Sequence, residues 1–344
     1  MYTRRFITMI GAQALAGALF LTPSPILGQA RPPAAPAKDV KKAWTAPRMA
    51  DGHPDLQGVW TTSTLTPLER PAEFGDKAFL TAAEAAEYEK RMAEYEKHEL
   101  GSKGRDGDLV PYNDFWTERN NKVVGSRRTS LIVDPPDGKI PRLTQEAKQT
   151  MEARAKYLKE HPLDGPEDLD LSMRCITRGL PQIPAAYNNN HQIVQAPGSV
   201  AILSERIHDA RVIPLDGRPH PQAAMRQWKG DSRGRWEGDT LVVDTTNFAL
   251  TGVYSRFDAL SGSDESLHVI ERFTRVDADT LLYQFTVDDP TAYTRQWSAK
   301  IPMTRTDDQM FEFACHEENY GMAHILSGAR AEERAAAGES AKKP

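Results

Sequence analysis

Short apolar runs separated by turn-forming residues fill residues 188–318 and constrain the fold more than any other feature of the chain. Asp-Gly at 216–217, Gly-Asp at 238–239 and Asp-Ala-Asp at 277–279 interrupt the runs. Strands at this spacing, linked by hairpin turns, are typical of an antiparallel meander that closes into a barrel or folds into a sandwich. The sequence therefore predicts a mainly β fold, with at least six antiparallel strands forming one meander within residues 192–315.

Details of this pattern make two local predictions. Gly238 is the residue of its turn that accepts positive φ freely, so we expect a tight hairpin with Gly238 in the left-handed region. The apolar residues of 310–315 predict the last strand of the meander.

Two helices are expected before the β-rich part. Thr81 is followed three residues later by Glu84, and Thr144 precedes Gln145 and Glu146, so both segments begin with a capping pattern. We expect helices near residues 81–100 and 144–161. Both belong to a single β-rich domain at residues 51–327.

The two ends of the chain differ from this domain in composition. Arg4 and Arg5, an uncharged run and a small-residue stretch predict a signal peptide at residues 1–30. Residues 31–50 are interpreted as a Pro/Ala-rich tether, and residues 328–344, rich in Ala, Glu and Lys without an apolar stripe, as a flexible tail.

The N-terminal segment predicts a periplasmic or secreted protein. The arginine pair resembles a twin-arginine export signal, and an ordinary export signal with the same pair is the alternative. The apolar run is short and interrupted by Gly11 and Gly17, so we expect no membrane span in the mature protein. Residues 1–30 hold two arginines and no acidic residue, so their removal makes the net charge of −5 more negative. A mildly acidic protein has no electrostatic surface for nucleic acid, and we expect no nucleic-acid partner.

The first strand candidate carries a short motif, Gly58-Val59-Trp60. A Gly-x-Trp at the first strand resembles the lipocalin-like folds, in which the tryptophan closes one end of a small barrel. With the hairpin spacing, this resemblance implies a lipocalin-like barrel with additional N-terminal helices.

Longer motifs cover nearly the whole mature chain. They are Pro-Asp-Leu-Gln-Gly-Val-Trp at 54–60, Ile-Val-Asp-Pro-Pro-Asp-Gly-Lys-Ile-Pro at 132–141, Ile-His-Asp-Ala-Arg at 207–211, Gly-Arg-Trp-Glu-Gly-Asp-Thr-Leu-Val-Val-Asp-Thr-Thr-Asn-Phe at 234–248 and Cys-His-Glu-Glu-Asn-Tyr-Gly at 315–321. Together they resemble a widespread family of exported bacterial proteins that are mostly labelled uncharacterised. The resemblance implies export and assigns no catalytic residue.

Cys175 and Cys315 are the only cysteines. An exported chain with an even number of cysteines can bridge them in an oxidising compartment. Two separate buried thiols are the alternative, because sequence does not determine pairing. Both interpretations stay open.

Histidines beside carboxylates are the main candidates for chemistry. His208 precedes Asp209, and His316 precedes Glu317 with Tyr320 close by. An imidazole held by a carboxylate acts as a general acid or base near neutral pH. Because neighbours on a straight strand face opposite ways, each pair requires a turn, a bulge or partners on other strands. We take these five residues as the candidate catalytic set and expect both rings at one pocket; the alternative is that each histidine is a satisfied rim residue.

Alternation along the strands suggests a ligand-binding face. Each of several strands has one apolar face and one mixed face, and a lumen with Asp244, Glu271 or Gln284 among aromatic residues would suit a small molecule. We assign these three residues and His191 as candidate ligand-binding residues. The alternative is that the mixed face is the solvent side of the sheet.

A metal site is a further interpretation. The usual zinc and calcium motifs are absent, but His191, His208, His268 and His316 could converge from neighbouring strands. We assign no metal ligands and predict no cofactor, while a metal ion remains an open alternative.

These observations predict an exported enzyme that acts on a small, largely apolar organic molecule by His/carboxylate acid–base chemistry, as a lyase, isomerase or hydrolase. No nucleophile elbow, phosphate loop or dinucleotide motif occurs. A non-catalytic carrier of lipocalin type, a metal-dependent enzyme with histidine ligands and a protein-binding module are the alternatives.

Overall fold

A ten-stranded antiparallel sheet forms the main part of the protein. The computed structural model describes residues 44–99, 122–161, 163–249, 260, 263, 265–307, 309–317 and 319–340. Its strands are β1 (Gly58–Thr61), β2 (Ile132–Asp134), β3 (Asn190–Ala196), β4 (Ser199–Ser204), β5 (Asp209–Pro214), β6 (Asp231–Glu237), β7 (Thr240–Thr246), β8 (His268–Arg275), β9 (Thr280–Asp288) and β10 (Trp297–Thr306). Its helices are α1 (Ala82–Glu99), α2 (Gln145–Glu160) and α3 (Tyr320–Ser340), with short 3₁₀ turns η1 (Ala72–Phe74), η2 (Pro166–Asp168) and η3 (Arg206–His208). Within this part of the chain, no helix has the length and apolar character needed to cross a membrane.

The strands follow the order β5-β4-β3-β1-β10-β9-β8-β7-β6, and β2 also pairs with β10. Two hairpin runs, β3 to β5 and β6 to β10, account for eight of them, and β1 lies between β3 and β10. The sequence correctly predicted antiparallel strands. The prediction that at least six of them form one uninterrupted meander is wrong, because β1 separates the two runs. A strand from the N-terminal part completes the sheet, and its four residues are too few for periodicity to reveal their partners.

Residues 310–315, expected as the last strand, do not form one. β10 already pairs with β9 on one side and with β1 and β2 on the other, so it offers no edge to a further strand. A disulfide between Cys175 and Cys315 instead holds the segment beside residues 172–175.

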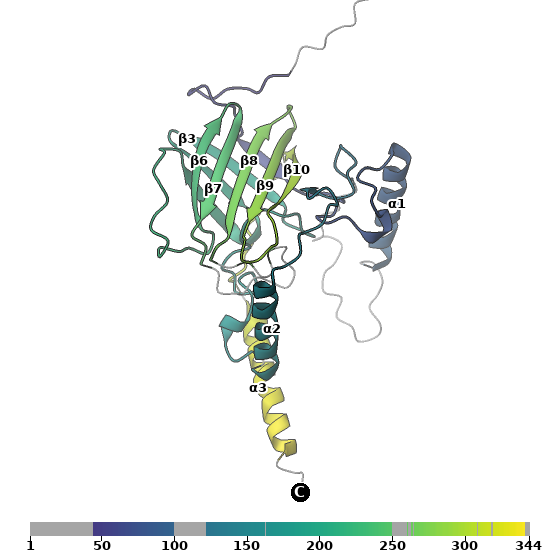
Figure 1. Ribbon diagram of the computed structural model, residues 1–344, viewed down its shortest axis with the longest axis vertical. Helices are drawn as coiled ribbons and strands as arrows, with labels where there is room; N and C mark the ends of the chain where they lie inside the picture. Colours follow the sequence, from purple (N-terminus) through teal and green to yellow (C-terminus); the bar gives the residue numbers. More distant parts are fainter. Residues whose placement is uncertain are drawn as a thin grey trace, which may run out of the picture. The chain divides into compact units, whose positions relative to one another are not determined.

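The sheet curls into a nearly closed barrel, and Figure 1 shows β6 to β9 side by side along its wall. The seam lies between β5 and β6, which are the two ends of the strand order and have no ladder between them in the described part of the chain. Side chains fill the seam. A Cβ atom on Gly234 would lie 2.5 Å from Leu215 Cδ2 and 2.8 Å from Ile213 Cγ2, so β6 packs against β5 at van der Waals distance.

Burial alternates strictly along β8 and β9, as the sequence pattern predicted. On β9, residues 281, 283, 285 and 287 are buried and the residues between them are half-buried. The buried faces fill the lumen with a ladder of rings, in which Phe285 lies 5.7 Å from Tyr283 and 5.5 Å from Trp297 between ring centroids. Phe273 stacks on Tyr283 at 4.9 Å. The lumen is therefore the hydrophobic core of the protein.

One end of the barrel, the hairpin end, is closed by the turns at 196–199, 237–240 and 275–280. Trp60 is fully buried there, as expected for its motif, and its indole N–H donates to the Leu56 carbonyl at 2.9 Å. The Arg275 guanidinium lies 5.5 Å from the Trp60 ring and donates to the Asp55 carbonyl. A cation over an indole face is attractive, so the two residues form a plug.

The first two helices begin at their expected caps. The Glu84 backbone N–H donates to Thr81 Oγ1 at 3.2 Å, and the Ala147 backbone N–H donates to Thr144 Oγ1 at 3.1 Å. At the other end of the chain, α3 extends into residues 328–340, for which the sequence suggested a flexible tail. Alanine and glutamate have high helix propensity, which explains a helix without an apolar stripe.

Two glycines on β6 and its turn should respond to substitution for different reasons. Gly238 has φ +59° and open space around it, so Gly238→Ala should cost only the left-handed backbone, about 1 kcal/mol. Gly234→Ala should cost about 1–3 kcal/mol, because the new methyl group overpacks the seam. Urea unfolding of both variants checks this; equal unfolding free energies for Gly234→Ala and wild type would show that the seam is not tightly packed.

Candidate functional site

The opposite end of the barrel, the loop end, receives the long connecting segments. Residues 163–189, 205–208 and 289–296 all meet the sheet there, where β3, β6, β8 and β10 begin. Connecting segments on a rigid scaffold are where binding and catalytic residues usually gather. We therefore expect the functional side chains at this end of the barrel.

Seven strands each contribute one polar side chain to the lumen, between the loop end and the middle of the barrel. None of the seven is more than 7% exposed. This lumen cluster consists of His191, Ser204, Arg211, Ser232, Thr245, Glu271 and Tyr283. Buried polar groups are costly unless they are paired, so the contacts within the cluster decide what it can do.

An ion pair between Arg211 and Glu271 forms the centre of the lumen cluster. Both guanidinium Nη atoms donate to the carboxylate, with Nη2 to Oε1 at 3.0 Å, and Arg211 Nη1 also donates to Ser232 Oγ at 3.3 Å. The Tyr283 hydroxyl donates to Glu271 Oε1 at 2.9 Å and accepts from the Gln182 backbone N–H at 3.1 Å. Burial, with the neighbouring carboxylate, raises the pKa of Tyr283 well above its usual value. The phenol is therefore a fixed proton donor to Glu271.

His191 lies beside this pair in its neutral form. Its Nδ1 is 3.1 Å from Ser204 Oγ on the neighbouring strand. Burial, together with the positive charge of Arg211, lowers the pKa of His191 to about 4. At neutral pH the ring is consequently an unprotonated base inside the barrel.

Asp209 and Lys229 flank the lumen cluster at the seam. Lys229 Nζ lies 2.6 Å from Asp209 Oδ1 and donates to the Ala210 carbonyl at 2.8 Å, and the Thr177 hydroxyl donates to Asp209 Oδ2. Burial lowers the pKa of Lys229 against the opposing effect of Asp209. An ionisable group with a shifted pKa beside other charged groups is typical of functional sites.

The structure thus brings together three residues that the sequence singled out, His191, Asp209 and Glu271. The expected lumen position is wrong for Asp244 and Gln284. Both alternate with buried residues of β7 and β9, so they lie on the outer face of the wall. The sequence showed two faces per strand without showing which mixed residue belonged to the inner one.

The other candidate catalytic residues are placed differently from the expectation. His208 is the last residue of the turn η3, is exposed and accepts from the Phe313 backbone N–H at 3.1 Å through Nδ1. His316, Glu317 and Tyr320 are exposed as well. The disulfide and the Phe313 contact bring the two segments near each other, but among the described contacts neither ring bonds to a carboxylate or to the Tyr320 hydroxyl. The expected shared hydrogen-bonded pocket is therefore not formed by these contacts.

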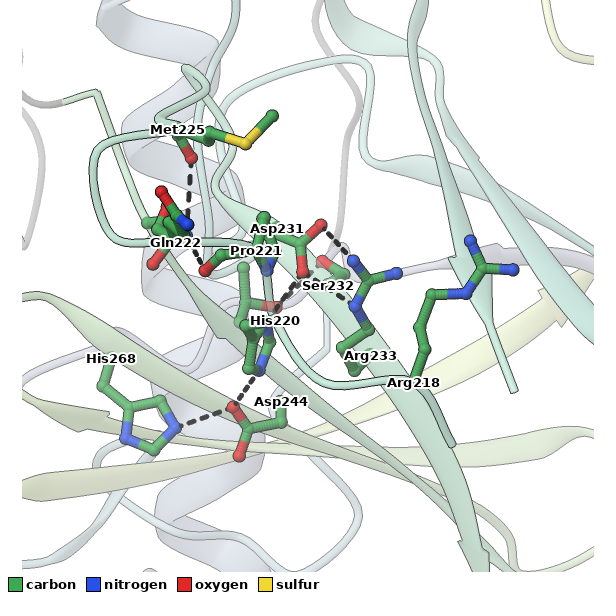
Figure 2. Close-up of polar contacts among 12 residues, drawn as sticks. Arg218, His220, Pro221, Gln222, Met225, Asp231, Ser232, Arg233, Asp244 and His268 are labelled. Carbon is green, nitrogen blue, oxygen red and sulfur yellow. Dashed lines mark hydrogen bonds and ion pairs between the residues drawn. The ribbon is translucent and has the colours of Figure 1, made fainter. Parts of the chain in front are cut away.

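A second polar group involves His220, Asp244 and His268 and lies on the outer face of the wall (Figure 2). His220 Nδ1 is 2.7 Å from Asp231 Oδ1, and its Nε2 is 3.0 Å from Asp244 Oδ1. His268 Nε2 lies 3.1 Å from the same Asp244 oxygen. Arg233 pairs with Asp231. This linked series of side chains, His220, Asp231, Arg233, Asp244 and His268, is called the outer chain. The hydrogen bond and the charge of Asp244 raise the pKa of His268, while His268 lowers the pKa of Asp244.

The outer chain fastens residues 215–230, a strap that runs along the barrel from the hairpin end to the loop end. His220 belongs to the strap, whereas Asp231, Asp244 and His268 belong to β6, β7 and β8. Asn247 Nδ2 donates to the Pro221, Gln222 and Met225 carbonyls at 3.1–3.4 Å. Lys229 is near the end of the strap, so these contacts also fix its backbone beside the seam.

The four histidines considered as metal ligands do not converge. His191 faces the lumen and His268 the outer side of the wall, while His208 and His316 are exposed. In the described ranges, no group of three or more His, Cys, Asp or Glu residues has a metal-binding arrangement.

Several central residues were missed by the sequence analysis, among them Arg211, Lys229 and Tyr283. Arg211 gave a weak signal, because it is a charged residue that alternates with Ile213 on the buried face of its strand. Lys229 gave none. Comparison of the chain with protein-family models, with curated proteins and with solved structures finds no match.

The buried neutral state of His191 predicts an acid-sensitive fold. Its pKa in the folded protein, about 4, is below the usual histidine value of 6.5, so the protein takes up a proton on unfolding between these two pH values. This contribution to the free energy of unfolding should be lost as pH falls from 6.5 to 4, by up to about 3 kcal/mol. Urea unfolding across this range should show a shallower decline in His191→Gln; identical slopes in the two proteins would contradict a neutral buried ring.

Proposed function

We propose that this protein is an exported enzyme that acts on a small, largely apolar organic molecule by acid–base chemistry at the loop end of its barrel. The acid–base groups would come from the lumen cluster and from the Asp209–Lys229 pair beside it. His191 supplies an unprotonated base, Asp209 and Lys229 form a pair that can exchange protons, and Glu271 is held in place by Arg211 and Tyr283. Proton abstraction of the lyase or isomerase kind suits this set best.

One observation carries the proposal. A neutral imidazole, a carboxylate–ammonium pair and a buried Arg–Glu–Tyr set occur together at the end of the barrel where the connecting segments meet. Groups whose pKa values are pushed apart by burial and charge are the usual basis of acid–base assignments. The outer chain carries less weight, because each of its described contacts also serves to fasten the strap.

Apolar groups also lie beside these polar ones. Tyr283 of the lumen cluster packs against Phe273 and Phe285 of the core, so a small molecule bound at the loop end would contact aromatic rings as well as a few fixed polar groups. Small-molecule sites typically combine apolar walls with a few placed polar groups.

A carrier is the second candidate, and one observation favours it. The Trp297 indole N–H is fully buried and donates to no group that the structure describes. An unpaired buried donor is costly, and the oxygen of a bound molecule would satisfy it without any reaction.

Export is supported by two independent features. The segment with Arg4 and Arg5 has the form of a secretory signal, although it lies outside the described residues. The Cys175–Cys315 disulfide links residues 140 positions apart, and such bonds persist in oxidising compartments.

The test begins with the protein exported by its native host. The molecule that copurifies is identified by mass spectrometry, and its conversion is followed with wild type, His191→Gln and Asp209→Asn. Each variant should lower turnover by about 10²- to 10⁴-fold. Asp239→Asn is the matched control, because Asp239 pairs with Arg48 at the hairpin end and should leave turnover unchanged. Full turnover in both site variants would refute the assignment, and a molecule recovered unchanged would support the carrier.

A further inference from the structure

Lys229 differs from the other lysines of the protein in its surroundings. Of the lysines whose side chains the structure describes, Lys229 alone is not exposed; its side chain is 17% exposed. It lies on the strap, which delivers it to the seam between β5 and β6. An exposed lysine is a solvated surface charge, whereas a lysine held inside a site is available for chemistry.

The groups around Lys229 suit an amine nucleophile. Asp209 holds the Nζ atom at 2.6 Å, and the charges of Arg211 and Glu271 both act on it. Burial and a neighbouring cation disfavour the ammonium form, which frees the amine lone pair, and a carboxylate within hydrogen-bond distance can accept and return the proton. The Ala210 carbonyl accepts a further bond from Nζ and fixes its position.

We propose that Lys229 forms a Schiff base with a carbonyl substrate, an aldehyde or ketone. Asp209 takes one proton from the Nζ ammonium, and the free amine attacks the carbonyl carbon. Asp209 returns that proton to the carbonyl oxygen and relays a second one from Nζ, so that the oxygen leaves as water. The ammonium and the neutral carbonyl compound become one iminium ion and one water, so the net charge is the same before and after the reaction. No oxidant or other reactant is required.

This inference rests on the proposed function and names its substrate class. An iminium ion acidifies the adjacent C–H bond, and an unprotonated histidine is the base that such a carbon requires. His191 in its neutral state would meet this need from the lumen side of the same site.

Competition among the lysines of one molecule tests the proposal without a known substrate. The disulfide-bonded mature protein is treated with benzaldehyde, a small and largely apolar aldehyde, and sodium cyanoborohydride at pH 7. The rate of N-benzylation at each lysine is then measured by peptide mass spectrometry. Lys229 should react faster than the exposed Lys139 and Lys300, by more than these two differ from each other, because burial lowers the pKa of Lys229 and so increases its fraction of free amine.

Two variants test whether the fast reaction depends on the Lys229 amine and on Asp209. Lys229→Arg keeps the cation beside Asp209 and should remove the fast adduct while leaving the reaction at Lys139 and Lys300 unchanged. Asp209→Asn should slow the adduct at Lys229, since the proton shuttle is lost. A Lys229 that reacts at or below the rate of the exposed lysines would overturn the Schiff-base proposal, because a lysine with only a structural ion pair is protected. The proposed acid–base function would survive that outcome if His191→Gln still abolished turnover.

Discussion

The buried ion pair between Arg211 and Glu271 is the interaction on which this barrel most depends. Arg211 belongs to the three-strand run that ends at the seam, and Glu271 belongs to the five-strand run on the other side. No ladder joins β5 and β6 in the described chain, so side chains must hold the two edges together. The pair does so across the lumen, and the packing of Gly234 against Ile213 and Leu215 does so within the wall.

The requirements of that pair also explain the polar content of the lumen. An isolated charge inside a barrel of aromatic rings would be strongly destabilising, and a buried pair is tolerated only when its remaining donors and acceptors are satisfied. Ser232, Tyr283 and Thr245 satisfy them, directly or through one another. Burial, together with the charge of Arg211, keeps the His191 ring neutral, and the charges of the pair also act on Lys229 at the seam. Closure of the barrel and the proposed chemistry thus depend on the same buried polar residues.

Much of the fold could be predicted from the sequence because its signals are local. Alternation placed Tyr283 and Phe285 on one face, and Gly238 marked its turn, where φ is +59°. The partners of β1 and the irregular path of residues 310–315 were not predictable, because pairing across long separations depends on which strand edges remain free. The disulfide belongs to the same class, since two cysteines 140 residues apart carry no local sign of contact.

The site was only partly predictable, for a related reason. His191, Asp209 and Glu271 carried a signal as ionisable residues among strands, and the structure gathers them. Lys229 is positioned by the strap, whose anchors His220 and Asn247 lie on no periodic element, so the sequence could not show where its side chain would be. Asp244 was an ionisable strand residue as well, yet it lies outside the barrel, which shows that residue type without face assignment is not sufficient.

A double-mutant cycle on the central pair tests this account most directly. The free energy of unfolding is measured in urea for Arg211→Met, Glu271→Leu and the double variant. Each single change leaves one charge buried and unpaired, so the account predicts a loss of about 3–5 kcal/mol for each. The double variant should lose much less than the sum, with a coupling of at least about 2 kcal/mol. Additive effects would contradict the claim that this ion pair closes the barrel and supports the groups around it.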